Sequence, residues 1–186
     1  MHEPSRRSVV AVAAIAATAL LIGGCGGAAS GDSASTAPSR AAAPEWPACF
    51  PGCEGEDLTG LNQEGGDISE GDFTKATLLR ANLTKANMSD AHMDGASLRF
   101  ATLDGATAQR LSATKADFER AQMENVDFTK ADLSGANLDG AEMSGSNLTD
   151  ANLTGAELTS ETGDVGVIWK NTTCPDGTVT TGKPCP

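Results

Sequence analysis

Apolar residues recur at every fifth position from residue 56 to residue 160. The stretch divides without a gap into 21 units of five, and the third position of each unit is apolar except at Gln63. Ala fills the first position in 14 of the 21 units, so a small residue usually precedes the apolar one by two. The third positions are Leu58, Gln63, Ile68, Phe73, Leu78, Leu83, Met88, Met93, Leu98, Leu103, Ala108, Ala113, Phe118, Met123, Phe128, Leu133, Leu138, Met143, Leu148, Leu153 and Leu158.

A period of five fits neither a regular helix nor a flat strand. Five residues advance an α-helix by about 500°, so successive third positions would point about 140° apart and leave no apolar stripe. Side chains alternate along a strand, so an odd period would place successive third positions on opposite faces. A chain that turns a corner after every unit satisfies the pattern, because four short sides then close a square coil with every third position inside. The 21 units correspond to about five such coils, stacked roughly 4.8 Å apart.

The units themselves resemble those of a known family. Residues 81–100 read ANLTK, ANMSD, AHMDG and ASLRF, and this A-(N/D)-L-x-x pattern is similar to that of pentapeptide repeat proteins. The resemblance covers residues 56–160 and implies an all-β fold, a right-handed quadrilateral β-helix. It also implies that Ala packs close inside the coil, that Leu or Phe fills its centre, and that the polar second residue holds the turn. Asn and Asp suit that position because their short side chains hydrogen-bond to nearby backbone.

Stacked coils predict vertical neighbours twenty residues apart, such as Leu83 and Leu103. The second positions then form four ladders, and in none of them are two carboxylates adjacent. Like charges directly opposite each other destabilise neighbouring strands, so this spacing is what stacking predicts. The small third position Ala108 is accompanied by Leu111, where Ala is usual, and by Phe128 one coil above. We expect these larger side chains to restore the packing density of the core.

Both ends of a solenoid expose apolar core and unpaired backbone, so we expect a cap at each end. Residues 46–55 are the predicted N-terminal cap, with Trp46 and Phe50 covering the first coil. Gln63 belongs to this first coil. We expect its amide to reach water there, because the end of a solenoid frays.

Residues 161–186 are the predicted C-terminal cap, with Val167, Ile168 and Trp169 covering the last coil. The segment WKNTTCPDGT, which begins at Trp169, resembles a tail found on exported actinobacterial members of the family. Its PDG sequence is a turn signal in its own right. The flanks are therefore predicted to close both ends of the rod.

Residues 1–24 have the pattern of an export signal. Two arginines precede the apolar run VVAVAAIAATALLI, which ends at Ile22. A basic start, a short apolar run and small residues before a cleavage site are typical of a secretory signal, and the run is short for a membrane span. The SRR sequence also resembles the start of a twin-arginine signal. Because Val9 and Val10 stand where that signal has larger apolar residues, the Sec route is favoured.

The signal ends in Ile22-Gly23-Gly24-Cys25, which resembles a bacterial lipobox. This resemblance implies cleavage before Cys25 and a diacylglyceryl group on its sulfur, with fatty acids such as palmitate. A plain secretory signal with a chance cysteine is the alternative. Residues 25–45 are then the lipidated cysteine and a flexible tether of small residues that cannot form a core. Two acyl chains suffice for lasting attachment, so the chain is predicted to be exported and anchored to the outer face of the cell membrane.

The other four cysteines are Cys49, Cys53, Cys174 and Cys185. An even number of cysteines outside the cytoplasm indicates disulfides, and four cysteines allow three connectivities. We favour Cys49–Cys53 and Cys174–Cys185, because each pair then lies within one cap. A four-cysteine zinc site is the alternative, but it would have to join opposite ends of the rod.

Composition and charge limit the functions that the chain can have. The formal net charge of −12 disfavours binding to nucleic acid, because acidic surfaces repel phosphates. Downstream of Cys25 the single histidine is His92, at an outward second position where a polar turn residue is expected. The chain has no Tyr, we find no phosphate-binding Gly loop, and a filled square coil offers no obvious substrate pocket. We therefore predict no enzyme activity, no bound metal and no cofactor.

One group of outward residues differs from the rest of the surface. On the first side of the predicted coil, Arg80, Phe100 and Arg120 are expected to stack in one column, with Leu79 and Arg99 beside it. Arginine next to an exposed aromatic residue is a recurrent composition of binding surfaces. The alternative is that the arginine stems only shield a stray phenylalanine. These five residues are the candidate partner patch.

Together these features predict a monomeric, non-catalytic surface lipoprotein that presents a rigid rod to an unidentified envelope or extracellular protein. The alternative is an acidic mimic of DNA that inhibits or protects a DNA topoisomerase, which is an activity of some pentapeptide repeat proteins. Those proteins act in the cytoplasm as dimers joined end to end. This chain instead has an export signal and predicted caps.

Overall fold

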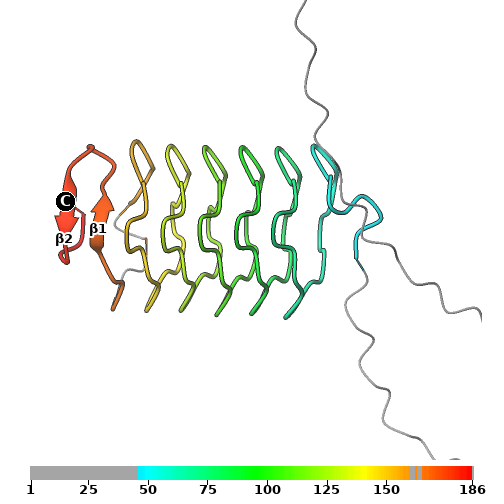
Figure 1. Ribbon diagram of the computed structural model, residues 1–186, viewed down its shortest axis with the longest axis horizontal. Helices are drawn as coiled ribbons and strands as arrows, with labels where there is room; N and C mark the ends of the chain where they lie inside the picture. Colours follow the sequence, from blue (N-terminus) through cyan, green and yellow to red (C-terminus); the bar gives the residue numbers. More distant parts are fainter. Residues whose placement is uncertain (1–45, 160–161, 163–164, 186) are drawn as a thin grey trace, which may run out of the picture. The chain divides into compact units, whose positions relative to one another are not determined.

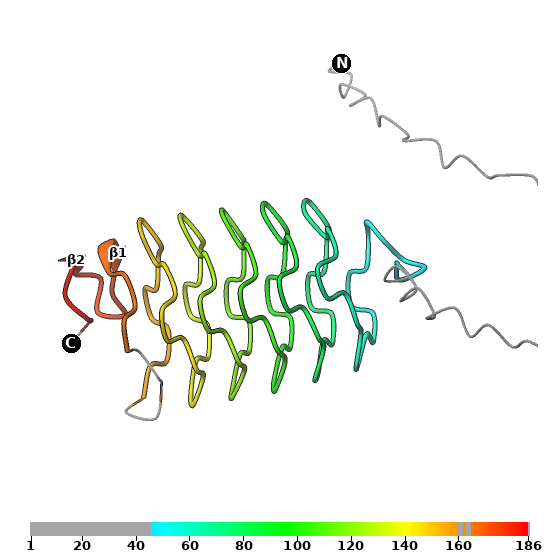
Figure 2. The ribbon, with the colours of Figure 1, turned by 90° about the horizontal axis from the view of Figure 1, so that it is seen from below.

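The structure is a computed structural model that describes residues 46–159, 162 and 165–185. All of these belong to the second of two units of the chain, Arg40–Pro186. The predicted signal, Cys25 and the tether lie outside the described residues. Within the described part, the backbone winds into a right-handed, four-sided β-helix whose coils lie side by side in chain order (Figure 1, Figure 2).

Each unit of five contributes one bridge and one corner. Its second residue pairs in parallel with the second residues twenty positions away, as Thr77 does with Asp57 and Ser97. Its third residue accepts a hydrogen bond across the corner from the next unit, as in Ala81 N–H to the Leu78 carbonyl at 3.0 Å. The fifth residue has φ between 55° and 73° in every unit from residue 55 to residue 155. A single positive φ at the second central residue defines a type II turn, which is how the chain makes its corners.

The unit 81–85 shows how these corners leave no backbone donor unused. The N–H of Ala81 donates across the corner, and the N–H of Asn82 donates to the coil below. The N–H groups of Leu83 and Lys85 donate to the coil above at 2.7 and 2.8 Å. The remaining donor, the N–H of Thr84, bonds to the side-chain oxygen of Asn82 at 3.1 Å. Buried backbone groups need such partners, so Asn or Asp at the second position completes the hydrogen bonding of the coil.

The core is a column of third residues surrounded by first residues. Every third residue from Gln63 to Leu153 is fully buried, whereas Leu58 and Leu158 at the two ends are only partly buried. Leu111, at a first position, and Phe128, in the column of third residues, are both buried, as the predicted compensation around Ala108 requires.

Gln63 contradicts one expectation from the sequence, because it is fully buried and does not reach water. The following unit begins with Gly66 where Ala is usual, and a Cβ there would lie 2.5 Å from the Gln63 side-chain oxygen. Gly71 likewise leaves space, since its Cβ would lie 2.6 Å from the ring of Phe73 and 2.8 Å from that of Phe50. Two glycines therefore admit larger side chains into the first coil.

The N-terminal end continues the repeat one unit further upstream than residue 56. Gly52 bridges to Asp72, and Cys53 is fully buried in the column of third residues. Phe50 packs between Trp46 and Phe73, with ring centroids 4.4 and 6.2 Å away. Aromatic rings therefore cover this end of the core, as predicted, although Trp46 stays half exposed.

The C-terminal end is closed by an antiparallel pair of strands, β1 (Lys170–Thr173) and β2 (Val179–Thr181). β1 extends the ladder of the last coil, because Ile168 and Thr173 pair with Asn147 and Asn152. Trp169 is buried against the core, but Ile168 is 51% exposed and does not cover it. The pairing explains this difference, since neighbouring residues of an extended segment point to opposite faces. The described residues include no apolar helix of membrane-spanning length.

Candidate functional site

The candidate partner patch lies on the wall of the β-helix formed by residues 56–60, 76–80, 96–100, 116–120 and 136–140, which we call wall 1. The N–H of Arg80 bonds to the carbonyl of Arg99 at 3.0 Å, and the N–H of Phe100 bonds to that of Glu119 at 3.1 Å. These bonds fix the coils in register, so Arg80, Phe100 and Arg120 occupy the same corner in three successive coils. Leu79 lies beside them and is partly buried.

Phe100 occupies a corner where its backbone is strained. Its φ is 56°, in the left-handed region that bulky residues rarely adopt. The other fifth positions from 55 to 155 are Gly, Asn, Asp, Glu, Lys or Arg. Phe100 is also 41% exposed, so burial of the ring does not account for its presence. A large side chain held in such a conformation is a reason to look for function at this position.

Arg99 fixes the ring from the neighbouring position. Its guanidinium bonds to the carboxylate of Glu119 at 2.7 Å and lies 3.6 Å from that of Asp117. The same guanidinium carbon is 5.8 Å from the centre of the Phe100 ring, within the range of a cation–π contact. The sequence predicted Arg99 as part of the patch but not Glu119, which holds it in place.

Arg80 and Arg120 are exposed and form no ion pair within the described residues. By contrast, Lys75, at the other corner of wall 1, pairs with Glu54 at 3.5 Å, and Arg110, on another wall, pairs with Asp90. The hydrogen bonds that Arg110 donates to Asp90 raise the pKa of Arg110 above its ordinary value. The two arginines that flank Phe100 therefore keep their charge available for a partner.

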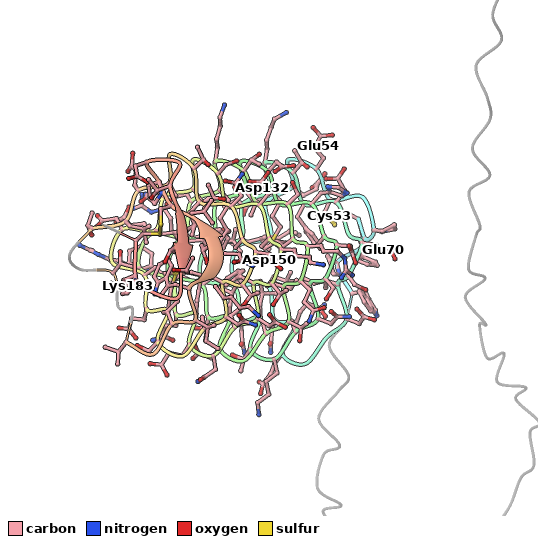
Figure 3. All side chains as sticks on the ribbon, turned by 60° about the vertical axis from the view of Figure 1, so that its left-hand side comes forward. Cys53, Glu54, Glu70, Asp132, Asp150 and Lys183 are labelled. Atoms are coloured by element: carbon pink, nitrogen blue, oxygen red, sulfur yellow. A yellow bond between two sulfur atoms is a disulfide. The ribbon has the colours of Figure 1, made fainter. Side chains whose placement is uncertain are left out.

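Charge is unevenly distributed along the axis of the β-helix. Residues 46–74 carry seven carboxylates and no Lys or Arg, and residues 131–159 carry five carboxylates and no Lys or Arg. Between them, residues 75–130 contain eight Lys or Arg and seven carboxylates. Side chains project outward all around the coils, with Glu54 and Glu70 at the acidic N-terminal end (Figure 3). The patch thus lies in the middle of the repeats, between two acidic segments, whereas the C-terminal cap, residues 165–185, carries Lys170, Lys183 and Asp176.

Asp94 is a polar residue whose role the sequence did not reveal. Its carboxylate accepts bonds at 2.8 Å from the N–H of Thr114 and from the hydroxyl of Ser112, both one coil above. Burial raises the pKa of Asp94, but the bonds from Thr114 and Ser112 outweigh it and hold that pKa below its ordinary value. Asp94 therefore replaces the Asn or Asp that the upper unit lacks at its second position.

Asp104 acts in the same way by accepting a bond from the N–H of Glu124 at 2.9 Å. A signal for both residues was present in the sequence. Each belongs to an Asp-Gly pair, and the unit above each has Ser112 or Gln122 in place of Asn or Asp. These carboxylates hold neighbouring coils together and do not mark a binding site.

His92 is exposed and lies near the carboxylates of Asp72, Asp90 and Asp94. No group of three or more His, Cys, Asp or Glu side chains in the described ranges is arranged to hold a metal ion. His92 thus occupies the outward turn position that the sequence predicted.

An open hollow of about 630 Å³ lies at the N-terminal end. It is lined by apolar groups of Pro47, Leu58 and Leu61, with Glu56 as its charged residue. A single carboxylate lacks the second acid, base or nucleophile that most hydrolytic chemistry uses. The hollow therefore offers no constellation of catalytic groups.

The four cysteines of the described residues form the two disulfides that the sequence favoured. Cys49 is joined to Cys53 and Cys174 to Cys185, so each bond lies at one end of the rod. Cys53 and Cys174 are fully buried, whereas Cys185 is partly buried. Cys25, the predicted lipidation site, lies outside the described residues.

The repeat region matches the family model "Pentapeptide repeats" in eight copies, over residues 67–99, 91–129 and 127–160. No curated protein matches the chain. Among solved structures, the pentapeptide repeat protein Rfr23 from the cyanobacterium Cyanothece 51142 is 28% identical, with 66% of this chain and 90% of that chain covered and a TM-score of 0.48. HetL from Nostoc sp. strain PCC 7120, a pentapeptide repeat protein involved in heterocyst differentiation regulation, is 24% identical over 69% of this chain and 76% of its own, with a TM-score of 0.29. QnrB1, a plasmid-mediated fluoroquinolone resistance protein, is 18% identical over 62% and 63%, with a TM-score of 0.32.

Proposed function

The chain belongs to the pentapeptide repeat family, and we propose that it is a non-catalytic interaction protein that presents wall 1 to a protein partner outside the cell. The observation that carries this proposal is Phe100, an exposed aromatic ring at a strained corner between two arginines that form no ion pair within the described residues. Aromatic residues and arginine are enriched at the centres of protein interfaces. Arg99 orders the ring in advance, which reduces the entropy that binding would cost.

The proposed location rests on the N-terminal sequence. The export signal of residues 1–24 and the lipobox-like sequence ending in Cys25 support cleavage, lipidation and anchoring to the outer face of the cell membrane. The small-residue composition of residues 26–45 supports a flexible tether. Disulfides persist in oxidising compartments outside the cytoplasm, and the two in this chain support the same location.

Replacing the proposed lipid-bearing residue tests the location. We expect the wild-type chain to sediment with membranes and to take up labelled palmitate, and the Cys25→Ala variant to lose both properties. A Cys25→Ala chain that still sediments with membranes and takes up label would contradict lipid anchoring at this residue.

Proximity labelling from the anchored protein tests the use of wall 1. We expect a set of labelled envelope proteins that disappears in the Phe100→Ser, Arg120→Ser variant. As a matched control, Lys130→Ser changes a residue at the same position of a unit on another wall and should leave the set unchanged. Identical sets for all three proteins would rule out the patch as the contact surface.

The alternative of a DNA mimic acting on a topoisomerase predicts a continuous acidic surface, because DNA carries a charge about every 1.7 Å. In this chain the acidic segments are separated by coils that contain eight Lys or Arg. The exposed ring of Phe100 interrupts any such surface on wall 1. Membrane retention of the exported chain, together with unchanged gyrase activity in its presence, would exclude the alternative.

A further inference from the structure

The charges on wall 1 define the chemistry of a partner more closely than the proposed function does. In the three middle coils, this wall and its two corners carry Lys75, Arg80, Arg99, Lys115 and Arg120. These are five of the ten Lys or Arg in the described residues. The acidic side chains of the same segments are Asp117 and Glu119, and both lie against Arg99, while Lys75 pairs with Glu54 of the coil below. The charge that remains, on Arg80, Lys115 and Arg120, is positive, although the chain as a whole is strongly acidic.

The corner column of Arg80, Phe100 and Arg120 suits a short extended peptide. Successive coils are roughly 4.8 Å apart, so the backbone positions of Arg80 and Arg120 are roughly 10 Å apart with Phe100 between them. Side chains alternate along an extended chain, so every second residue faces the wall, and residues four apart span roughly 13 Å. The long arginine side chains can make up the difference, so carboxylates four residues apart would reach one guanidinium each, with the side chain midway between them over the ring.

We propose that wall 1 binds an extended acidic peptide segment in which two carboxylates, four residues apart, pair with Arg80 and Arg120 while the apolar side chain midway between them packs on Phe100. This proposal rests on the proposed function and adds the chemical class of the partner. Arginine binds carboxylates through two parallel hydrogen bonds, which gives such pairing its directional specificity. The half-buried Leu79 adds apolar surface beside the ring.

The acidic repeat segments on either side of the middle coils favour a short acidic segment as partner over an extended anionic surface. Seven carboxylates in residues 46–74 and five in residues 131–159 lie on either side of the middle coils. A membrane rich in anionic lipid, or a nucleic acid, would have to approach these segments as well and would be repelled by them. A peptide of a few residues can contact the middle coils alone.

Selection from a random eight-residue peptide library on the exported protein tests the proposal. We expect enrichment of peptides that have two acidic residues four positions apart with an aromatic or aliphatic residue midway between them. A labelled peptide of this design, with Trp between two Glu, should lose at least about tenfold in affinity for the Arg80→Gln, Arg120→Gln variant. It should bind the Lys130→Gln variant within about twofold of wild type, because that lysine lies on a different wall.

Three results would overturn the proposal. The first is a selection without acidic enrichment, and the second is an equal loss of affinity in the two glutamine variants, which would show attraction to charge in general. The third is tighter binding to phosphatidylglycerol vesicles than to the peptide. If proximity labelling still depends on Phe100 and Arg120 when the peptide fails, the display function stands and only the acidic partner is wrong.

Discussion

At the scale of single residues, the fifth positions distinguish residues that the fold explains from one residue, Phe100, that it does not explain. A left-handed backbone favours Gly and Asn, because a Cβ is strained there. The repeat nevertheless tolerates long charged residues, and several lean over glycines of the next coil, as Lys115 does over Gly135. Phe100 does not fit this pattern, since its ring is exposed and is held by Arg99. We interpret it as a residue retained for binding at some expense of stability.

This interpretation predicts that the Phe100→Gly variant is about as stable as wild type. Relief of the strained φ should offset the lost packing of a half-exposed ring, so the free energy of unfolding should change by less than about 0.5 kcal/mol. Urea denaturation measures it. A loss of 2 kcal/mol or more would show that Phe100 is a structural residue.

The glycines of the first coil lead to a second prediction. Gly66→Ala would place a methyl group 2.5 Å from the Gln63 side-chain oxygen and should cost about 1–3 kcal/mol. Combining it with Gln63→Leu restores the usual residues at both positions and should recover most of that loss. Gly52→Ala is the control, because nothing lies within 4 Å of its Cβ position. A Gly66→Ala variant as stable as the Gly52→Ala control would contradict the packing argument.

The sequence predicts the buried column well, because the period of the repeat alone decides which positions point into the core. It does not predict the burial of Gln63, because that depends on a glycine in the next unit. Nor does it predict the Arg99–Glu119 pair, because an outward side chain has several possible partners on the neighbouring coils. Which contact forms depends on the folded geometry and does not alter the period of the sequence.

At the scale of the coil, side chains complete hydrogen bonds that the backbone leaves open. Asn or Asp at the second position usually serves the fourth N–H of its own unit, whereas Asp94 serves Thr114 of the unit above. The buried hydroxyl of Ser146 acts between coils too, since it accepts from the N–H of Val126 at 2.9 Å and donates to the carbonyl of Met123 at 2.6 Å. Each of these contacts fastens neighbouring coils to each other.

Removing the carboxylate of Asp94 should therefore destabilise the rod in a pH-dependent way. The pKa of Asp94 is depressed in the folded state, so its stabilisation is complete above the unfolded pKa near 4 and declines as the pH falls through the folded pKa. We expect Asp94→Ala to lower the free energy of unfolding by about 1–3 kcal/mol at pH 7. Wild type and variant should converge as the pH falls below the folded pKa of Asp94. The exposed Glu142, also in the repeat, provides the control variant Glu142→Ala. A difference that is independent of pH would contradict this assignment.

The C-terminal hairpin is the element that closes the last coil. The Cys174–Cys185 bond spans a sequence separation of 11 and holds β2 against β1. Replacing both cysteines by Ala should lower the free energy of unfolding by about 2–3 kcal/mol. Hydrogen exchange should rise first in residues 170–181, because the end of a solenoid opens before its middle. Unchanged exchange in these strands would show that Trp169 alone secures the cap.

At the scale of the whole described unit, the rod separates its tasks along its length. The ends carry the disulfides and the aromatic cover, the first and last coils of the repeat are acidic, and the middle coils carry eight Lys or Arg and the patch of wall 1. The period of the repeat made the coils predictable, and stacking then predicted the column of the patch. The uneven distribution of charge along the chain can be read from the sequence. Only the folded coils show which of these charges lie on the same wall.

The most direct test of this account compares the four walls at one height of the rod. A photo-crosslinking amino acid replaces, one at a time, the fourth residues Thr74, Leu79, Thr84 and Ser89 in the full-length protein expressed in cells. We predict crosslinked partner adducts from position 79, on wall 1, and far fewer from the other three walls. Equal adducts from all four positions, or adducts from another wall alone, would contradict the claim that wall 1 is the binding surface.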